Sequence, residues 1–391
     1  MRSTLVLAAA TALVATARAE PAPHDFTSEV RALHAAAACG APPPAGVDAA
    51  VVAAHCKAVD AQVATWRSRF RDKAAAFFAR QLGKPPSTVV YPFGGGDLVT
   101  ALVVYPDATE YTTLSLEGMG DPRVALAGKR ANLAAQLAHV RDTLNVTFGW
   151  AWNTTYQLSN SSSDSDHGAV IPPILTSALV ALAANGYEPL EVRYFTLGDD
   201  GAIRYVDDAA IDAFDHAAKP TGRKAQNAVQ AGLFDDVEIA FRAKADPDAP
   251  RKLFRHVTAD LSDTGLADHP AALAYLRARG ASVAAMTKAA SYLLWKPSFA
   301  TLRDYLLGHA AVIVSDDTGV PPGLAPGFTY KVWGRYLGAH FDFADRATAK
   351  QLVALWQSDA NQGAIDFRFG YYDNADHAHV MIARPSSPRE P

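Results

Sequence analysis

The sequence predicts an α+β protein with a mixed, largely antiparallel sheet, clustered helices and an N-terminal helical hairpin. Two observations favour this class. Short β-type runs follow one another across Gly-, Pro- and Asp-rich turns, and the helical segments occur in groups instead of alternating regularly with strands. The composition, with 49% hydrophobic and 19% charged residues, is typical of a folded globular chain.

The N-terminus has the three parts of a secretory signal. Arg2 precedes an apolar run from Leu5 to Ala15, and Ala17-Arg18-Ala19 offers the small-x-small pattern that signal peptidase accepts. The apolar run is too short to span a bilayer, which needs about 20 apolar residues. We therefore expect residues 1–19 to be a cleaved signal peptide and the mature protein to be periplasmic or extracellular and bacterial.

The N-terminal hairpin is predicted from two helical segments around a proline-rich break. Phe26–Ala38 has helical composition, 40–44 interrupts it, and Val47–Leu82 resumes with apolar residues near helical spacing. Cys39 and Cys56 are the two cysteines of the chain, and an even count in an exported protein favours a disulfide. Two free buried thiols are the alternative.

The remaining chain is predicted to form the α+β core over residues 86–384, after a hairpin domain at 20–85 and before a disordered tail at 385–391. A small antiparallel meander is expected first, and further strands and helices follow. The expected strands are Val89–Phe93, Leu98–Tyr105, Thr112–Leu116, Leu190–Leu197, Ile203–Val206, Val237–Ala243, Lys252–Leu261, Ala311–Ser315, Phe328–Tyr336, Ile365–Tyr371 and His379–Ala383. The expected helices are Val124–Leu144, Ile174–Ala184, Pro270–Arg279, Ser282–Trp295, Ser298–His309 and Ala344–Asp359.

Several function classes are disfavoured. The sequence contains no G-x-S-x-G, H-E-x-x-H, G-x-x-x-x-G-K-[ST], C-x-x-C or G-x-G-x-x-G motif, which argues against the commonest hydrolase, zincin, P-loop and dinucleotide signatures. The formal net charge is −4, and it becomes −6 when Arg2 and Arg18 leave with the signal peptide. An acidic chain is a poor ligand for nucleic acid.

Asp97 ends the most unusual local string, Tyr91 to Asp97, in which Gly94 to Gly96 separate two predicted strands. A glycine-lined turn allows close approach of a ligand, and a carboxylate beside it is a candidate binding group. The favoured alternative is a turn in which Asp97 accepts hydrogen bonds from backbone amides.

Asp316 and Asp317 follow an apolar strand and precede Thr318 and Gly319. Adjacent carboxylates at a strand end can bind a divalent cation or share a proton. Asp-Asp-Thr-Gly is also ordinary turn chemistry, and we expect a turn first.

His377 and His379 are weaker candidates for a metal site, because His-x-His on a strand places both rings on one face. A solvated turn followed by a strand is the favoured interpretation. Lys288, Ser291 and Tyr292 lie at helical spacing, and we expect them on a helix surface.

Five segments together resemble an uncharacterised family of exported bacterial proteins. The resemblance extends from about Trp66 to Ala383 and rests on Tyr91–Asp97, Val104–Ala108, Lys288–Leu293, Asp316–Pro321 and Phe367–Tyr371. In that family a proline stands where this chain has Gly96. The resemblance implies export and one large domain, and it transfers no activity and no catalytic residue.

Two functions from different classes follow. The first is a binding or structural envelope protein that holds a glycan, a peptide or a partner protein, without a membrane span. The second is a hydrolase that uses Asp97, Asp316 and Asp317, with a divalent cation as a possible cofactor. Convergence of these three side chains in one cleft would favour the enzyme.

Cleavage of the signal gives the first testable prediction. The intact mass of protein recovered from a secreting bacterial host should correspond to a chain that begins at Glu20. A mature chain that still carries residues 1–19 would contradict export by this signal.

Overall fold

The computed structural model describes residues 21–124, 126, 130–150, 171–217, 232–336, 346–370 and 378–387. Within these residues, ten strands form one mixed sheet with the order β4-β3-β5-β6-β2-β1-β7-β8-β10-β9. The strands are β1 Thr88–Pro92, β2 Glu110–Ser115, β3 Tyr187–Leu197, β4 Ile203–Tyr205, β5 Asp236–Ala243, β6 Lys252–Thr258, β7 Val283–Thr287, β8 Ala310–Ser315, β9 Phe328–Gly334 and β10 His379–Pro385. The α+β class predicted from the sequence is confirmed.

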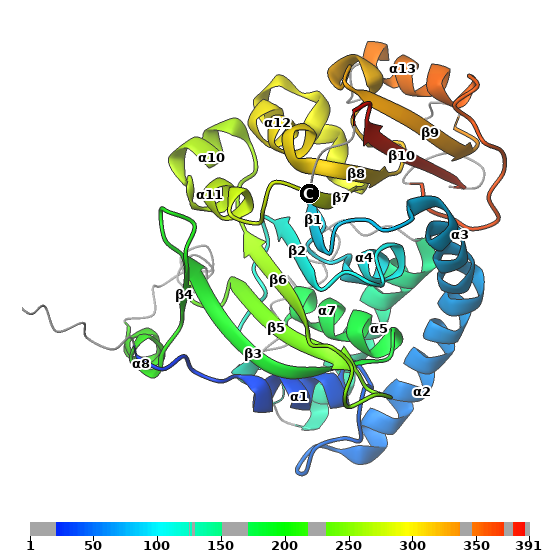
Figure 1. Ribbon diagram of the computed structural model, residues 1–391. Helices are drawn as coiled ribbons and strands as arrows, with labels where there is room; N and C mark the ends of the chain where they lie inside the picture. The colour runs from blue at the N-terminus through cyan, green and yellow to red at the C-terminus, as the bar shows by residue number, and fades with distance from the viewer. Residues whose placement is uncertain are drawn as a thin grey trace, which may run out of the picture.

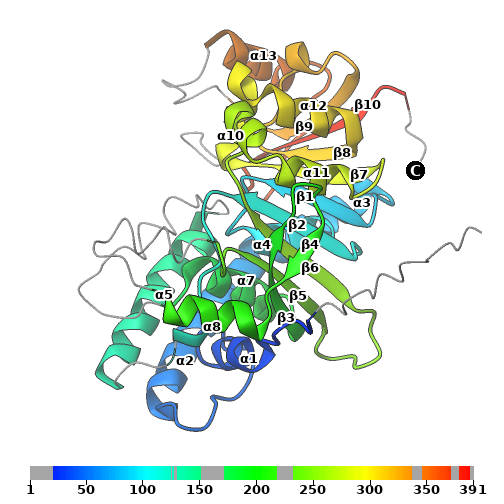
Figure 2. The same ribbon diagram turned by 90° about the vertical axis from the view of Figure 1, so that its left-hand side faces the viewer.

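Helices cover both faces of this sheet (Figures 1 and 2). One face, which carries Val89 and Tyr91, packs against α1, α2, α3, α4, α5 and α7, and the other, which carries Val90, packs against α10, α11 and α12. The helices are α1 Thr27–Ala36, α2 Ala49–Trp66, α3 Asp72–Leu82, α4 Leu98–Val104, α5 Arg130–Trp150, α7 Pro173–Ala184, α8 Asp208–His216, α10 Asp263–Asp268, α11 Ala271–Arg277, α12 Ala300–His309 and α13 Arg346–Trp356. Neighbouring residues of β1 therefore contribute to two separate cores.

The N-terminal helices follow the predicted hairpin. Asp48 caps α2 by accepting hydrogen bonds from the amides of Ala50 and Val51. The helix continues through a π-helical turn at Arg67–Arg71 into α3, which agrees with the expected long helix up to Leu82. Cys39 and Cys56 form the predicted disulfide, which ties the end of α1 to α2.

The expected antiparallel meander is wrong. The residues expected as its second strand form α4, whose seven side chains are all buried. β1 and β2 on either side of this helix pair in parallel, as a β-α-β unit requires. A helix that is apolar all round shows no 3.6-residue pattern, so its sequence cannot be distinguished from a buried strand by periodicity.

Two further segments differ from the expectation. The first of them is the expected helix Ser282–Trp295. Its first part, Val283–Thr287, forms the central strand β7, which is buried throughout. Its last part, Ala289–Trp295, forms a 3₁₀ helix. No strand forms over 365–370, the described part of the expected strand Ile365–Tyr371. Phe367 and Phe369 have the two-residue spacing of buried strand residues, but both side chains pack on aromatic rings of the N-terminal helices.

The central strands are parallel and the outer ones antiparallel. β6, β2, β1, β7 and β8 run in the same direction, whereas β10 runs opposite to β8 and to β9. β3 pairs antiparallel with β4 and β5, as the hairpin signal at 198–201 predicts for the first pair. Antiparallel pairing also joins β5 to β6.

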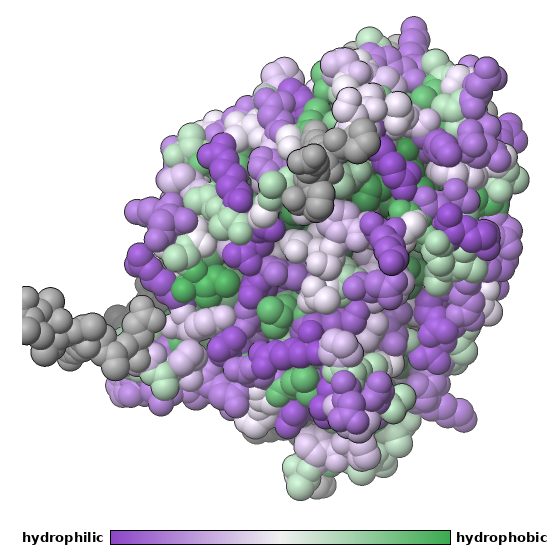
Figure 3. Space-filling view, in the orientation of Figure 1, coloured by the Kyte–Doolittle hydropathy of each residue, from purple (hydrophilic) through white to green (hydrophobic). Residues whose placement is uncertain are grey.

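The surface is mostly hydrophilic. In the face shown in Figure 3, hydrophobic residues occur in small separate groups among hydrophilic ones. None of the helices in the described ranges combines the length and hydrophobicity needed to cross a bilayer.

The disulfide gives a second prediction. Replacing Cys39 and Cys56 together with serine should lower the free energy of unfolding by about 3 kcal/mol, because the bond closes a loop with a sequence separation of 17. Denaturant unfolding measures this change, and wild-type protein unfolded under reducing conditions is the matched control. Labelling of both thiols in the native, unreduced protein would contradict the bond.

Candidate functional site

A group of charged and polar side chains lies at the carboxyl edge of the three parallel strands β1, β7 and β8. The segment 93–97 follows β1, Lys288 follows β7, and Asp316 follows β8. In the register, Val90 lies beside Ala285, and Thr287 lies beside Ser315. Because the strands are parallel, their ends bring these side chains together.

Lys288 lies at the centre of this group. Its side chain is completely buried, its Nζ lies 3.6 Å from Oδ2 of Asp97, and it stands 5.1 Å from the centroid of the Phe369 ring. The ammonium forms no hydrogen bond among the described residues. Since removing a cation from water is costly, this arrangement needs the nearby carboxylates.

Asp97 is held by two hydroxyl groups. Tyr91 donates from its phenol to Oδ2 at 2.8 Å, and Thr100 donates from Oγ1 to Oδ1 at 2.6 Å. Burial, with a further contribution from Asp97, raises the pKa of Tyr91 well above its usual value, so the phenol keeps its proton. The carboxylate of Asp97 thus binds side chains, whereas the turn interpretation of the sequence expects backbone amides.

Asp316 joins the ends of β7 and β8. Its Oδ2 accepts from the amide of Ala289 at 3.1 Å, and its Oδ1 accepts from the amide and hydroxyl of Thr318 at 2.8 and 2.5 Å. Burial first, and then the neighbouring Asp317, raise the pKa of Asp316 to about 7, against the opposing effects of Thr318 and Lys288. Asp316 therefore forms the expected turn with Thr318, and it also binds the backbone that follows β7.

Asp317 binds His379. The imidazole Nε2 lies 2.7 Å from Oδ1 of Asp317, and both side chains are completely buried. His379 begins β10, whose antiparallel register with β8 brings it to this end of the sheet. The rings of Tyr336 and Trp356 lie against the imidazole, at 5.5 and 5.8 Å between centroids.

Backbone strain occurs beside the same strand ends. Phe93 and Ala289 adopt positive φ angles of 62° and 56°, which residues other than glycine rarely adopt. Ala289 donates its amide to Asp316, a bond that helps to hold this conformation. Such strain is often found where a fold positions functional groups.

Glu117 lies two residues beyond the end of β2, on the same edge. Its Oε2 is buried and has no hydrogen-bond partner among the residues that the structure describes. His256 donates from Nε2 to the carbonyl oxygen of Glu117 at 2.8 Å, and its Nδ1 accepts from the hydroxyl of Thr113 at 2.9 Å. Leu116, beside Glu117, is 69% exposed and is the one large hydrophobic residue of the described chain to be so exposed.

A metal site is not apparent here. The described residues contain no group of three or more His, Cys, Asp or Glu side chains placed to hold a metal ion. The oxygens of Asp97 and Asp316 are occupied by hydroxyls, amides and Lys288 instead.

The structure places four candidate residues from the sequence at this edge: Asp97, the pair Asp316 and Asp317, and the weaker candidate His379. His377 lies outside the described residues. Lys288 and Ser291 were expected on a helix surface, and this is wrong, because both are completely buried beyond a central strand. The available signal for a buried lysine at a strand end was its position two residues after the uncharged, apolar run Val283–Met286.

Comparisons with known proteins identify no relative of this chain. No family model, no curated protein and no solved structure matches this chain.

The raised pKa of Asp316 gives a third prediction. The pKa of Asp316 is about 7 in the folded protein, against a usual value of 3.8, so its carboxyl group binds a proton more tightly when the chain is folded. The resulting stabilisation of the folded state is complete below pH 3.8 and is lost as the pH rises from 3.8 through 7. Asp316→Asn cannot titrate, so its loss of unfolding free energy relative to wild type should shrink between pH 4 and 7. Denaturant unfolding across this range measures the difference. Asp107→Asn, at an exposed position, is the control, and a penalty independent of pH would contradict the assignment.

Proposed function

We propose that the protein is a binding protein that works outside the cytoplasm and holds a small molecule bearing a nucleoside at the carboxyl edge of its parallel strands. The observation that supports this most strongly is the strand order. Numbered along the chain, the five parallel strands β6, β2, β1, β7 and β8 have the order 3-2-1-4-5. This order is shared with doubly wound sheets that bind nucleotides, an analogy at the level of topology.

The topology also indicates where the ligand would bind. From β1 the chain crosses by α4 on one face to β2, and from β7 it crosses by α12 on the other face to β8. The direction of winding therefore reverses between β1 and β7. Open sheets bind ligands outside the strand ends at such a reversal. Lys288 and Asp97 lie at this position.

The turn after β1 needs glycine because it packs closely on the ring of Tyr91. Gly94 to Gly96 connect β1 to Asp97 and α4. A Cβ atom on Gly94 would lie 2.4 Å from the ring of Tyr91, so this position requires glycine. Its glycines do not have the usual G-x-G-x-x-G spacing, so the sequence motif does not identify this turn.

Glu117 and Leu116 suit the two chemical parts of a nucleoside. An acidic residue about 20 residues after the glycine-rich turn accepts hydrogen bonds from ribose hydroxyls in doubly wound sheets. Glu117 has this spacing, and its buried Oε2 lacks a hydrogen-bond partner within the described part of the chain. Leu116 offers an exposed apolar surface for a base. The buried oxygen is otherwise costly, and ribose hydroxyls would satisfy it.

A hydrolase is the second candidate, because Asp317 and His379 form a carboxylate–imidazole pair of the kind that supports proton transfer. It ranks second because both side chains are completely buried, so a substrate would need the structure to open before reaching them. Asp97 lies 3.6 Å from the buried ammonium of Lys288, and a buried cation requires such a partner whether or not the site performs chemistry.

A nucleoside-binding experiment tests the proposal. Adenosine, cytidine and ATP are added separately to the mature protein, and calorimetry measures the affinity. At least one should bind, and Glu117→Gln should weaken binding about tenfold or more, because a neutral amide replaces the acceptor for the hydroxyl pair. The matching deoxynucleoside should bind wild type less tightly.

Asp107→Asn provides the control, since it also replaces an acid by an amide but lies at the exposed opposite end of β2. It should leave the affinity unchanged. Failure of all three probes to bind, or equal binding by wild type and Glu117→Gln, would reject a nucleoside ligand at this edge.

A further inference from the structure

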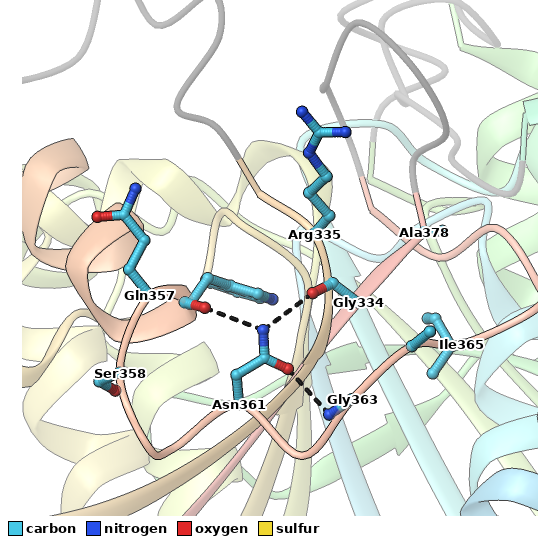
Figure 4. A pocket seen from close by; sticks show the side chains of 10 residues that line it. Gly334, Arg335, Gln357, Ser358, Asn361, Gly363, Ile365 and Ala378 are labelled. Carbon is cyan, nitrogen blue, oxygen red and sulfur yellow. Dashed lines mark hydrogen bonds between the residues drawn. The ribbon is translucent and has the colours of Figure 1, made fainter.

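Two adjoining hollows lie beside the segment 361–368, away from the strand edge described above. The first has a volume of about 580 Å³ and is bounded by Arg335, Gln357 and Asn361 (Figure 4). The second has a volume of about 420 Å³ and is bounded by Arg69 and Arg368. Ile365 and Ala378 line both, so the hollows meet at these two residues. We call them together the cationic groove.

The side chain of Asn361 connects backbone segments that line the first hollow. Its amide nitrogen donates to the carbonyls of Gly334 and Trp356, at 3.1 and 2.9 Å, and its oxygen accepts from the amide of Gly363 at 3.0 Å (Figure 4). These bonds fasten the turn after α13 to the end of β9. Figure 4 shows Arg335 and Gln357 on opposite sides of Asn361, extending in the same direction.

The groove is positively charged in a chain that is acidic overall. Arg69, Arg335 and Arg368 are exposed, and none of them forms an ion pair within the described ranges. Lys73 pairs with Asp366, the one acidic residue of the lining, at 3.1 Å. The net charge of the chain is −4. Among the residues that the structure describes, three guanidinium groups without ion-pair partners therefore line the two hollows.

The lining also offers apolar and neutral polar surface. Ile365 and Phe148 are partly exposed in the lining, and Gln357, in the first hollow, has an exposed side chain with a neutral amide group. A uronic acid has matching parts: an apolar ring face, hydroxyl groups, and a carboxylate that a guanidinium binds through two hydrogen bonds. A purely ionic ligand would not use the apolar floor.

We propose that the cationic groove binds an acidic oligosaccharide composed of uronic acids. Carboxylates of successive sugars contact Arg335 and Arg368, and sugar rings cover Ile365 and Phe148. The groove shares no residue with the nucleoside site proposed above, so this proposal stands or falls independently of it.

Oligogalacturonate is the probe, titrated calorimetrically into the mature protein in about 50 mM salt, where surface charges are only partly screened. Wild type should bind it, and Arg335→Gln combined with Arg368→Gln should weaken binding about tenfold or more. Arg277→Gln, an exposed arginine on α11 outside the groove, is the matched control and should leave the affinity unchanged.

Two comparison ligands separate the alternatives. A neutral maltooligosaccharide should bind at least about tenfold more weakly than oligogalacturonate, because it lacks carboxylates. Polyglutamate should also bind more weakly, because it lacks sugar rings. Equal binding of either compound, no binding of oligogalacturonate, or an equal loss with Arg277→Gln would overturn the proposal.

Discussion

Parallel pairing of β1, β7 and β8 is the constraint on which the candidate site depends. Parallel strands require a crossover on a face of the sheet, and these crossovers place α4 and α12 on opposite faces. The strands then end together at one edge. Residues far apart in sequence, such as Asp97 and Lys288, become neighbours there because Lys288 directly follows β7 and Asp97 ends the short turn that follows β1.

Burial of charge is the main energetic cost at this edge. Lys288 has no hydrogen bond within the described chain, and Asp317 and His379 are completely buried. Removing one member would leave an opposite charge in an apolar surrounding, which is usually more destabilising than replacing a whole ion pair with hydrophobic residues. The chain tolerates this arrangement because the two cores on either side of the sheet are large. Charge that a fold retains at such a cost commonly serves binding or chemistry.

The two proposed sites differ in physical character. The strand edge combines buried charge, strained backbone at Phe93 and Ala289, and an oxygen of Glu117 that has no hydrogen-bond partner in the described ranges. The cationic groove instead offers exposed arginines around an apolar floor. A compact ligand with hydroxyl groups suits the first, and an extended anionic ligand suits the second. A binding protein with both sites would connect a small molecule to a glycan.

The sequence by itself determined the α+β class, the disulfide and most amphipathic or half-exposed elements, including the β3–β4 hairpin and α13. These features follow from local signals: turn residues, apolar periodicity and an even cysteine count. Only the tertiary structure decided that Leu98–Val104 is a helix and Val283–Thr287 a strand, since a segment buried on every side has no polar face to reveal its period. For the same reason the meeting of Asp97, Lys288, Asp316 and His379 was not predictable. Their proximity depends on the order and direction of strands, which are set by long-range packing and not by any residue's neighbours in sequence.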